Sequence, residues 1–157
     1  MILSALIMSA ALLCQSDVAY QIQDPVTQQV VEVDYGTCDT YQNRWEVTLT
    51  EEEIDVLAKI LWLEARGEND LGQQLVVITV LNRIQDGRFG DGLTGVLSAP
   101  GQFSTWQSRD SAKPTPREYN NILAVLHGQV DSGIYFARFL YFNNVGNGVK
   151  IGGHYFR

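Results

Sequence analysis

Glu64 is the residue of this sequence whose type and position best suit it for chemistry. It continues an apolar stripe with spacings of three and four, formed by Ile54, Leu57, Ile60 and Leu61. These spacings place all five side chains on one face of a helix. Partial burial disfavours the charged form of a carboxyl group, and such a group can act as a general acid. The alternative is a core carboxylate paired with Arg66, Arg83 or a backbone amide, although residues two apart on a helix, such as 64 and 66, point to different sides.

Two further polar residues, Glu68 and His154, are secondary candidates. Glu68 lies four residues after Glu64 but beyond Gly67, so the sequence leaves open whether it approaches Glu64 or caps the next helix. We expect His154 to be a hydrogen-bonded structural residue. His127 is expected at the end of a helix, where its charge would suit the helix dipole. Two distant histidines do not make a metal site, so we expect no metal and no cofactor.

Capping boxes predict the helices that carry these residues. Residues 50–53 (TEEE) mark a helix start, and Arg66-Gly67 marks its end. Residues 115–118 (TPRE) mark a second helix that runs to His127 and stops at Gly128.

The remaining pattern predicts an α+β fold, mostly helical, with a C-terminal β-hairpin. Residues 71–84 are long enough for a buried helix, but their β-branched residues also favour a strand. Four glycines predict a long loop over 85–95. The dipeptide Asn147-Gly148 predicts a type I′ turn between strands at 139–143 and 149–156.

The N-terminal third differs from the rest of the chain. Residues 1–14 are apolar and uncharged, but too short for a typical spanning helix. We expect residues 1–19 to be a targeting or anchor segment, which would allow membrane association; a buried N-terminal helix is the alternative. Residues 20–47 read as an acidic linker with one short strand at 26–33, and 48–157 as the catalytic domain. A disulfide between Cys14 and Cys38 is compatible with the sequence but not required by it.

Charge excludes one broad class of partner. The chain of 157 residues has 18 acidic and 11 basic side chains and a net charge of −7, so we expect no nucleic-acid binding. Ten of the acids lie in the first 55 residues. The remainder is close to neutral and could approach an anionic polymer.

An ordered set of motifs connects this sequence to a known family. They are EARGE at 64–68, Gly72-Gln73, VLNR at 80–83, PGQFS at 100–104, YFN at 141–143 and IGGH at 151–154. This set, over residues 54–156, resembles the SleB/CwlJ-type cell wall hydrolases, a family of spore cortex-lytic enzymes with relatives in non-sporulating bacteria and phages. The resemblance implies a lysozyme-like domain that cleaves peptidoglycan glycan strands as a lytic transglycosylase, with Glu64 as the catalytic acid.

Sugar recognition needs aromatic faces and amide or hydroxyl partners, and residues 102–106 (QFSTW) provide both within five residues. Gln102 and Ser104 are expected to orient Glu64 or the N-acetyl group, and Trp106 to stack on a sugar, with a core position as the alternative for Trp106. Tyr141 and Asn143 are similar to a Tyr-Asn element that holds the catalytic Glu in lysozyme-like transglycosylases. The partner would be peptidoglycan, met after export to the periplasm or cell wall, from a membrane tether, or as part of a phage or virion.

Three other functions compete with this interpretation. A second carboxylate near Glu64 would allow ordinary hydrolysis, for which Glu68 is the candidate. A non-catalytic wall-binding protein would not need Glu64. An amidase or peptidase would need a zinc cluster or a Cys–His pair, and Cys38 lies in the linker.

Overall fold

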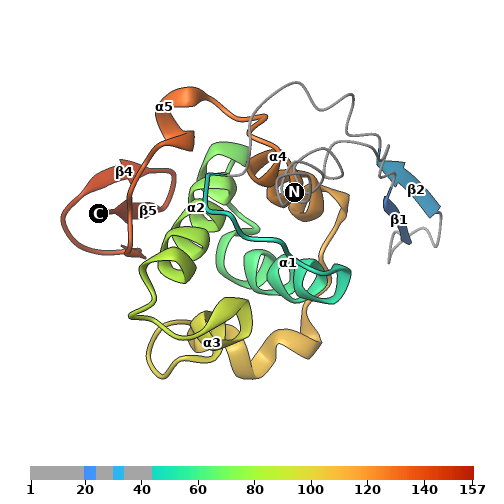
Figure 1. Cartoon of the computed structure of the whole chain (residues 1–157), viewed down its shortest axis with the longest axis horizontal. Helices are drawn as coiled ribbons and strands as arrows, with labels where there is room; N and C mark the ends of the chain where they lie inside the picture. The colour runs from blue at the N-terminus through green and yellow to red at the C-terminus, as the bar shows by residue number, and fades with distance from the viewer. Residues whose placement is uncertain (1–19, 24–29, 34–43) are drawn as a thin grey trace, which may run out of the picture.

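The computed structural model describes residues 20–23, 30–33 and 44–157, which form helices and two small antiparallel sheets (Figure 1). In chain order the elements are β1 (Tyr20–Gln23), β2 (Val30–Val33), α1 (Glu51–Ala65), α2 (Asp70–Asp86), α3 (Gly92–Ser98), the 3₁₀ helix η1 (Ser104–Ser111), α4 (Pro116–Leu126), α5 (Ser132–Tyr135), β3 (Phe142–Asn143), β4 (Val149–Ile151) and β5 (His154–Phe156). The expected targeting segment at 1–19 and both cysteines lie outside the described residues. β2 falls within the strand expected at 26–33 and pairs with β1.

The predicted capping boxes begin α1 and α4. The Thr50 hydroxyl accepts a hydrogen bond from the Glu53 backbone N–H at 3.2 Å, and the Glu53 carboxylate accepts one from the Thr50 N–H at 2.9 Å. Thr115 and Glu118 form the same reciprocal pair at the start of α4. α1 ends at Ala65 with Arg66 as its C-cap residue, and α4 ends at Leu126 with His127 as its C-cap residue, within one residue of the predicted ends.

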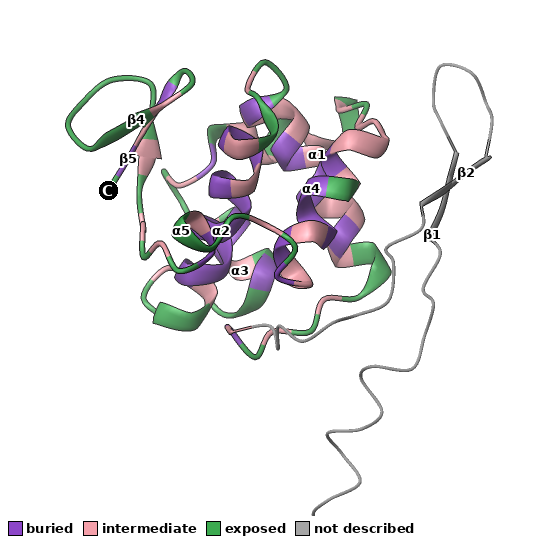
Figure 2. Ribbon diagram, turned by 90° about the horizontal axis from the view of Figure 1, so that it is seen from above, coloured by how far each residue is buried: buried purple, intermediate pink, exposed green. Residues whose placement is uncertain are grey.

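The core lies where α1, α2 and α4 face one another, and Figure 2 shows their buried residues on these facing sides. The four apolar residues of the stripe before Glu64 are at most 3% exposed. α2 resolves the ambiguity of its sequence in favour of a helix, because Asn69 caps its first turn and Gly87 ends it in the left-handed region. Its β-branched residues are buried on all sides, which explains why the segment shows no helical stripe.

The prediction of a long loop over 85–95 is wrong for residues 92–95, because α3 begins at Gly92. Leu93, Val96 and Leu97 are buried, so helical spacing of apolar residues outweighs the glycines. A Cβ on Gly90 would overlap the backbone of Gly95, so the close approach of the chain before α3 requires glycine.

The C-terminal sheet contains a β-hairpin, as predicted, but the hairpin's turn divides the strand expected at 149–156 into β4 and β5. The strand order is β3-β5-β4, and the hairpin joins β4 to β5 through Gly152-Gly153. Asn147-Gly148 instead lies in the loop between β3 and β4. Both dipeptides suit a tight turn, and Gly152, with a φ of 59°, adopts the left-handed conformation that such a turn needs.

The packed part of the chain begins before residue 48. The Trp45 side chain is 3% exposed, and its Nε1–H donates to Asn82 Oδ1 at 2.8 Å. The Arg44 guanidinium donates to the same oxygen at 2.8 Å. Of these two residues of the predicted linker, Trp45 belongs to the core and Arg44 is hydrogen-bonded to α2 beside it. Within the described residues, no helix combines the length and apolar character that crossing a membrane requires.

Candidate active site

Glu64 lies in the last turn of α1, half-buried, and lines two adjoining hollows. We call them the η1 pocket and the hairpin pocket. The η1 pocket is lined by Glu64, Gln102, Ser104, Phe142, Asn143, Asn144 and Val145. The hairpin pocket is lined by Leu63, Glu64, Arg66, Gly67, Glu68, Asn144, Gly153 and His154. Glu64 is thus placed between two surfaces that could each hold part of an extended ligand.

The hydroxyl of Thr105 contacts the Glu64 carboxylate. Thr105 Oγ1 donates to Glu64 Oε1 at 2.6 Å, from η1 to α1. Sequence reasoning passed over Thr105 in favour of its neighbours, because nothing in the pattern predicts the 3₁₀ helix that turns this side chain toward α1. A carboxylate held at one oxygen keeps its other oxygen available to a ligand.

Neither arginine considered as a core partner pairs with Glu64 in the described part of the chain. Arg83 Nε donates to the Leu140 carbonyl at 2.7 Å, and the Arg66 guanidinium lies 4.6 Å from the centre of the Trp62 ring. The structure therefore does not support the interpretation of Glu64 as an ion-paired core residue.

Three of the residues expected to bind substrate or orient Glu64 line the η1 pocket with it: Gln102, Ser104 and Asn143. Ser104 begins η1 and Gln102 lies two residues before it, whereas Asn143 ends β3. Segments about 40 residues apart in the chain thus converge on one carboxylate. Their roles in binding remain predictions.

Trp106 and Tyr141 lie apart from both pockets. Trp106 is half-buried against the core, with the Arg109 guanidinium 4.2 Å from the centre of its ring. Tyr141 is 42% exposed and meets the Phe89 ring edge-on, 5.7 Å between centroids. Phe142, and not Tyr141, packs toward the core, as expected from strand alternation.

Glu68 is tied to the β4–β5 turn. Its Oε2 and Oε1 accept hydrogen bonds from the Gly153 N–H at 2.8 and 3.1 Å, and Oε1 lies 3.5 Å from His154 Nδ1. The side chains of Glu68 and His154 are only 13% and 7% exposed. Their proximity within the hairpin pocket was not foreseen, since they stand far apart in the sequence.

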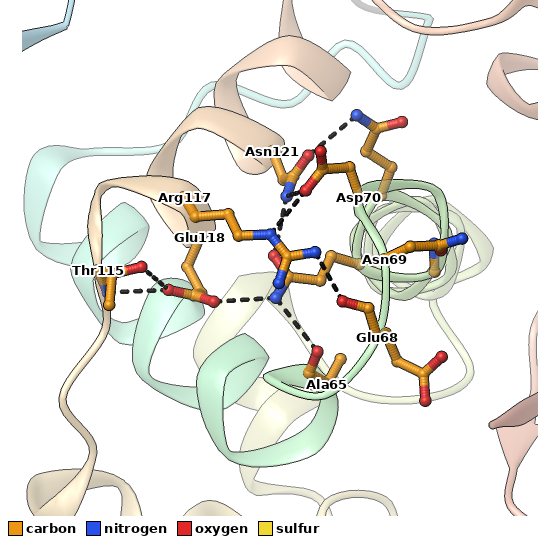
Figure 3. Close-up of polar contacts among 11 residues, drawn as sticks. Ala65, Glu68, Asn69, Asp70, Thr115, Arg117, Glu118 and Asn121 are labelled. Atoms are coloured by element: carbon orange, nitrogen blue, oxygen red, sulfur yellow. Dashed lines mark hydrogen bonds and ion pairs between the residues drawn. The ribbon is translucent and has the colours of Figure 1, made fainter. Parts of the chain in front are cut away.

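A buried polar network fixes the junction of α1 and α2 beside Glu64 (Figure 3). The fully buried Gln73 donates to the Ala65 carbonyl at 3.1 Å and to the Glu118 carboxylate at 2.9 Å. Arg117 donates to the Glu68 carbonyl at 2.6 Å, and the Glu68 side chain points away from this network. The backbone that follows Glu64 is thereby anchored to α4, through the carbonyls of Ala65 and Glu68. Gln73 belongs to the recognised motifs, but the sequence assigned it no role.

Arg83 anchors the segment that leads into β3. Its side chain is buried beside the rings of four aromatic residues: Phe89, Phe103, Tyr141 and Phe142. Burial lowers the pKa of this guanidinium from its usual value, although the nearby Tyr141 opposes the shift. Arg83 belongs to α2, and its hydrogen bond to the Leu140 carbonyl fixes the backbone three residues before Asn143. This bond therefore helps to set the position of Asn143 relative to α2.

The fold and the site define a class of protein: a small, mostly helical domain with a half-buried carboxylate, Glu64, between a 3₁₀ helix and a C-terminal hairpin. The Cell Wall Hydrolase family model matches residues 67–156, more than half of the chain, and the chain belongs to this family. Glu64 stands three residues before the matched range. The resemblance noted from the motifs is confirmed.

Relatives agree with this assignment. The chain is 34% identical over 86 residues to a spore cortex-lytic enzyme of Halalkalibacterium halodurans, a match that covers 54% of this chain and 26% of that protein. The chain thus spans about a quarter of the length of this curated relative.

Two solved structures share the fold. The catalytic domain of the Bacillus cereus SleB protein matches with a TM-score of 0.58 and 25% identity, over 69% of this chain and 91% of that domain. The catalytic domain of the germination-specific lytic transglycosylase SleB from Bacillus anthracis matches with a TM-score of 0.57 and 24% identity, over 69% and 95%. The predicted α+β, mostly helical fold is therefore confirmed.

Proposed function

We propose that this chain is a lytic transglycosylase that cleaves peptidoglycan between N-acetylmuramic acid and N-acetylglucosamine, with Glu64 as its single acid and base. The observation that carries the proposal is the position of Glu64, which lines both pockets while Thr105 holds one of its oxygens. The family and its spore cortex-lytic relative support peptidoglycan as the substrate.

The reaction needs one carboxyl group used twice. Protonated Glu64 donates its proton to the glycosidic oxygen, and the bond from that oxygen to C1 of the muramic acid breaks. The Glu64 carboxylate then takes the proton from the C6 hydroxyl of the same sugar. That oxygen bonds to C1 and closes a 1,6-anhydro ring, so no water is consumed and Glu64 ends in its starting state.

The surroundings of Glu68 favour this route over hydrolysis. Hydrolysis by the usual pair of carboxylates needs a second one free to attack the sugar or activate water. Glu68 is the other carboxylate lining the pockets, and it is occupied by the Gly153 N–H. An attacking hydroxyl within the substrate is already close to its target, and this proximity offsets the lack of a second carboxylate.

The η1 pocket suits recognition of an N-acetyl sugar. Gln102, Ser104 and Asn143 offer amide and hydroxyl groups beside Glu64, and we assign them the sugar contacts. We assign Trp106 and Tyr141 to packing, since neither lines a pocket. We also propose that the chain acts outside the cytoplasmic membrane, where peptidoglycan lies, with the apolar residues 1–14 serving export or tethering.

Hydrolysis of the same bond is the second candidate, and one observation favours it. Glu68 lines the hairpin pocket together with Glu64, so its release from the turn would add a second carboxylate to the site. A non-catalytic wall-binding protein is the third candidate.

The test uses the full chain, its Glu64→Gln variant and purified sacculi. We expect the wild type to release soluble glycan fragments, and Glu64→Gln to lower the rate by about 10³-fold, within the range for loss of a general acid. Glu52→Gln, an exposed change of the same kind on the same helix, should keep the wild-type rate. No release by a folded wild type would contradict catalysis and favour the binding protein.

A further inference from the structure

Arg66 presents an unpaired guanidinium to the hairpin pocket. It is exposed, follows the last residue of α1 and lines that pocket with Glu64. Its backbone N–H caps α1 by donating to the Trp62 carbonyl at 3.2 Å. Among the described residues its side chain makes no ion pair or hydrogen bond, and its one contact is the Trp62 ring, 4.6 Å away.

Stacking on Trp62 leaves the guanidinium free to bind a ligand. An arginine over an aromatic ring keeps the N–H groups at its edge available, and these groups match the two oxygens of a carboxylate. Trp62 belongs to the same helix as Glu64, so the stack holds the cation at a set position relative to the end of α1 that carries Glu64.

The charges of the two pockets make Arg66 the group that can attract an anion. It is the only Lys or Arg among their lining residues. The two lining carboxylates, Glu64 and Glu68, already accept hydrogen bonds from Thr105 and Gly153. His154 lies against Glu68 and is buried.

We propose that Arg66 binds a carboxylate carried by the lactyl arm of the muramic acid, and that this contact makes the enzyme prefer anionic glycan strands. The inference rests on the proposed function, because it assumes that the strand crosses Glu64 and occupies both pockets. The carboxylate has two sources: the lactyl group itself, where the stem peptide has been removed, or the acidic residues of an attached stem peptide.

The experiment compares four substrates. Two are intact sacculi, with stem peptides, and amidase-treated strands, with free lactyl carboxylates. The other two are the same materials after their carboxylates are capped with methylamine by carbodiimide coupling. Rates are measured for the full-length wild type, Arg66→Gln, Arg66→Lys and Arg138→Gln, and binding of soluble fragments is measured with Glu64→Gln.

We expect capping to lower wild-type kcat/KM by about five- to tenfold, the size expected for an exposed charge-assisted hydrogen bond. Arg66→Gln should cleave capped and uncapped strands equally, at the rate that the wild type shows on capped strands. The change relative to the wild type should lie mainly in KM. Arg66→Lys should recover part of the preference. Arg138, an exposed arginine that lines neither pocket, supplies a control for net charge, and its variant should keep the full preference.

The uncapped substrates distinguish the two sources. A preference on amidase-treated strands alone would identify the lactyl carboxylate, and a preference on sacculi alone would identify the stem peptide. A preference on both would show that Arg66 accepts a carboxylate from either source. Equal wild-type rates on capped and uncapped strands, with equal binding by Glu64→Gln, would overturn the inference and leave the proposed function standing. A folded wild type that cleaves none of the four would overturn both.

Discussion

The Thr105 hydroxyl and the Glu64 carboxylate form a 2.6 Å hydrogen bond that joins η1 to the last turn of α1. The bond holds the half-buried Glu64 carboxylate in one orientation. Among the described residues, no ion pair holds this carboxylate. We therefore expect Thr105→Val, which keeps the shape and removes the donor, to lower kcat about ten- to a hundredfold with little change in KM.

The matched control for this prediction is Thr105→Ser, which keeps the hydroxyl and should stay within a few fold of the wild type. Steady-state rates on soluble glycan strands provide the measurement. A Thr105→Val enzyme with wild-type kcat would show that Glu64 is positioned by other contacts.

Glu68 supplies a test that separates positioning from catalysis. If its role is to accept the Gly153 N–H, Glu68→Gln retains an acceptor oxygen and most of the activity. Glu68→Ala leaves that N–H unpaired and should lower the free energy of unfolding by about 1–3 kcal/mol. Activity and thermal unfolding of the two variants are compared. A Glu68→Gln loss as large as that of Glu64→Gln, without loss of stability, would assign Glu68 a catalytic role.

The turn at Gly152 is predicted to depend on the absence of a side chain. With a φ of 59°, Gly152 is strained by any Cβ, and that Cβ would also overlap the Glu68 carboxylate. Gly152→Ala should destabilise the fold by about 2–4 kcal/mol. Gly87→Ala is the control, because Gly87 has a φ of 75° but open space around it, and it should lose only about 1 kcal/mol. Equal losses in chemical denaturation would mean that the Glu68 contact adds nothing.

Local signals made α1 and α4 predictable. Both begin with capping boxes and carry apolar residues at helical spacing, and these signals act within a few residues. α2 was ambiguous because burial on all its sides removes the helical stripe, leaving length as the evidence. The hairpin turn was misplaced because Asn147-Gly148 and Gly152-Gly153 both suit a tight turn. The choice depends on the pairing of β3 with β5, a contact between distant residues.

The site was predictable where it depends on one helix, and less so where it depends on contacts between elements. Glu64 was singled out because it is the polar residue that continues an apolar stripe, and the structure places it in both pockets. Thr105 was missed because a 3₁₀ helix sets its direction, and the pairing of Glu68 with Gly153 was missed because it joins residues 85 apart. For Trp106 the sequence left a sugar contact and a core position open, and the structure packs its half-buried ring against the core.

His127 predicts a pH dependence of stability. Burial lowers the pKa of this half-buried imidazole from the usual 6.5, so the unfolded chain takes up a proton at higher pH than the folded one. The free energy of unfolding should therefore fall as pH drops from about 6.5 through the lower folded-state pKa, and this contribution should then level off. Denaturation of the wild type and His127→Gln between pH 7.5 and about 5 measures it. A parallel pH dependence in the two proteins would contradict the prediction.

The most direct test of the central claim is whether an oxygen atom from solvent water enters the new end of the cleaved glycan strand. Sacculi are digested by the full chain in water enriched in heavy oxygen, and the released muropeptides are weighed by mass spectrometry. The single-carboxylate route predicts ends lighter than the hydrated product by one water (about 18 Da), free of label and absent with Glu64→Gln. Hydrated ends that carry the solvent label would contradict it and show that a water molecule attacks the sugar.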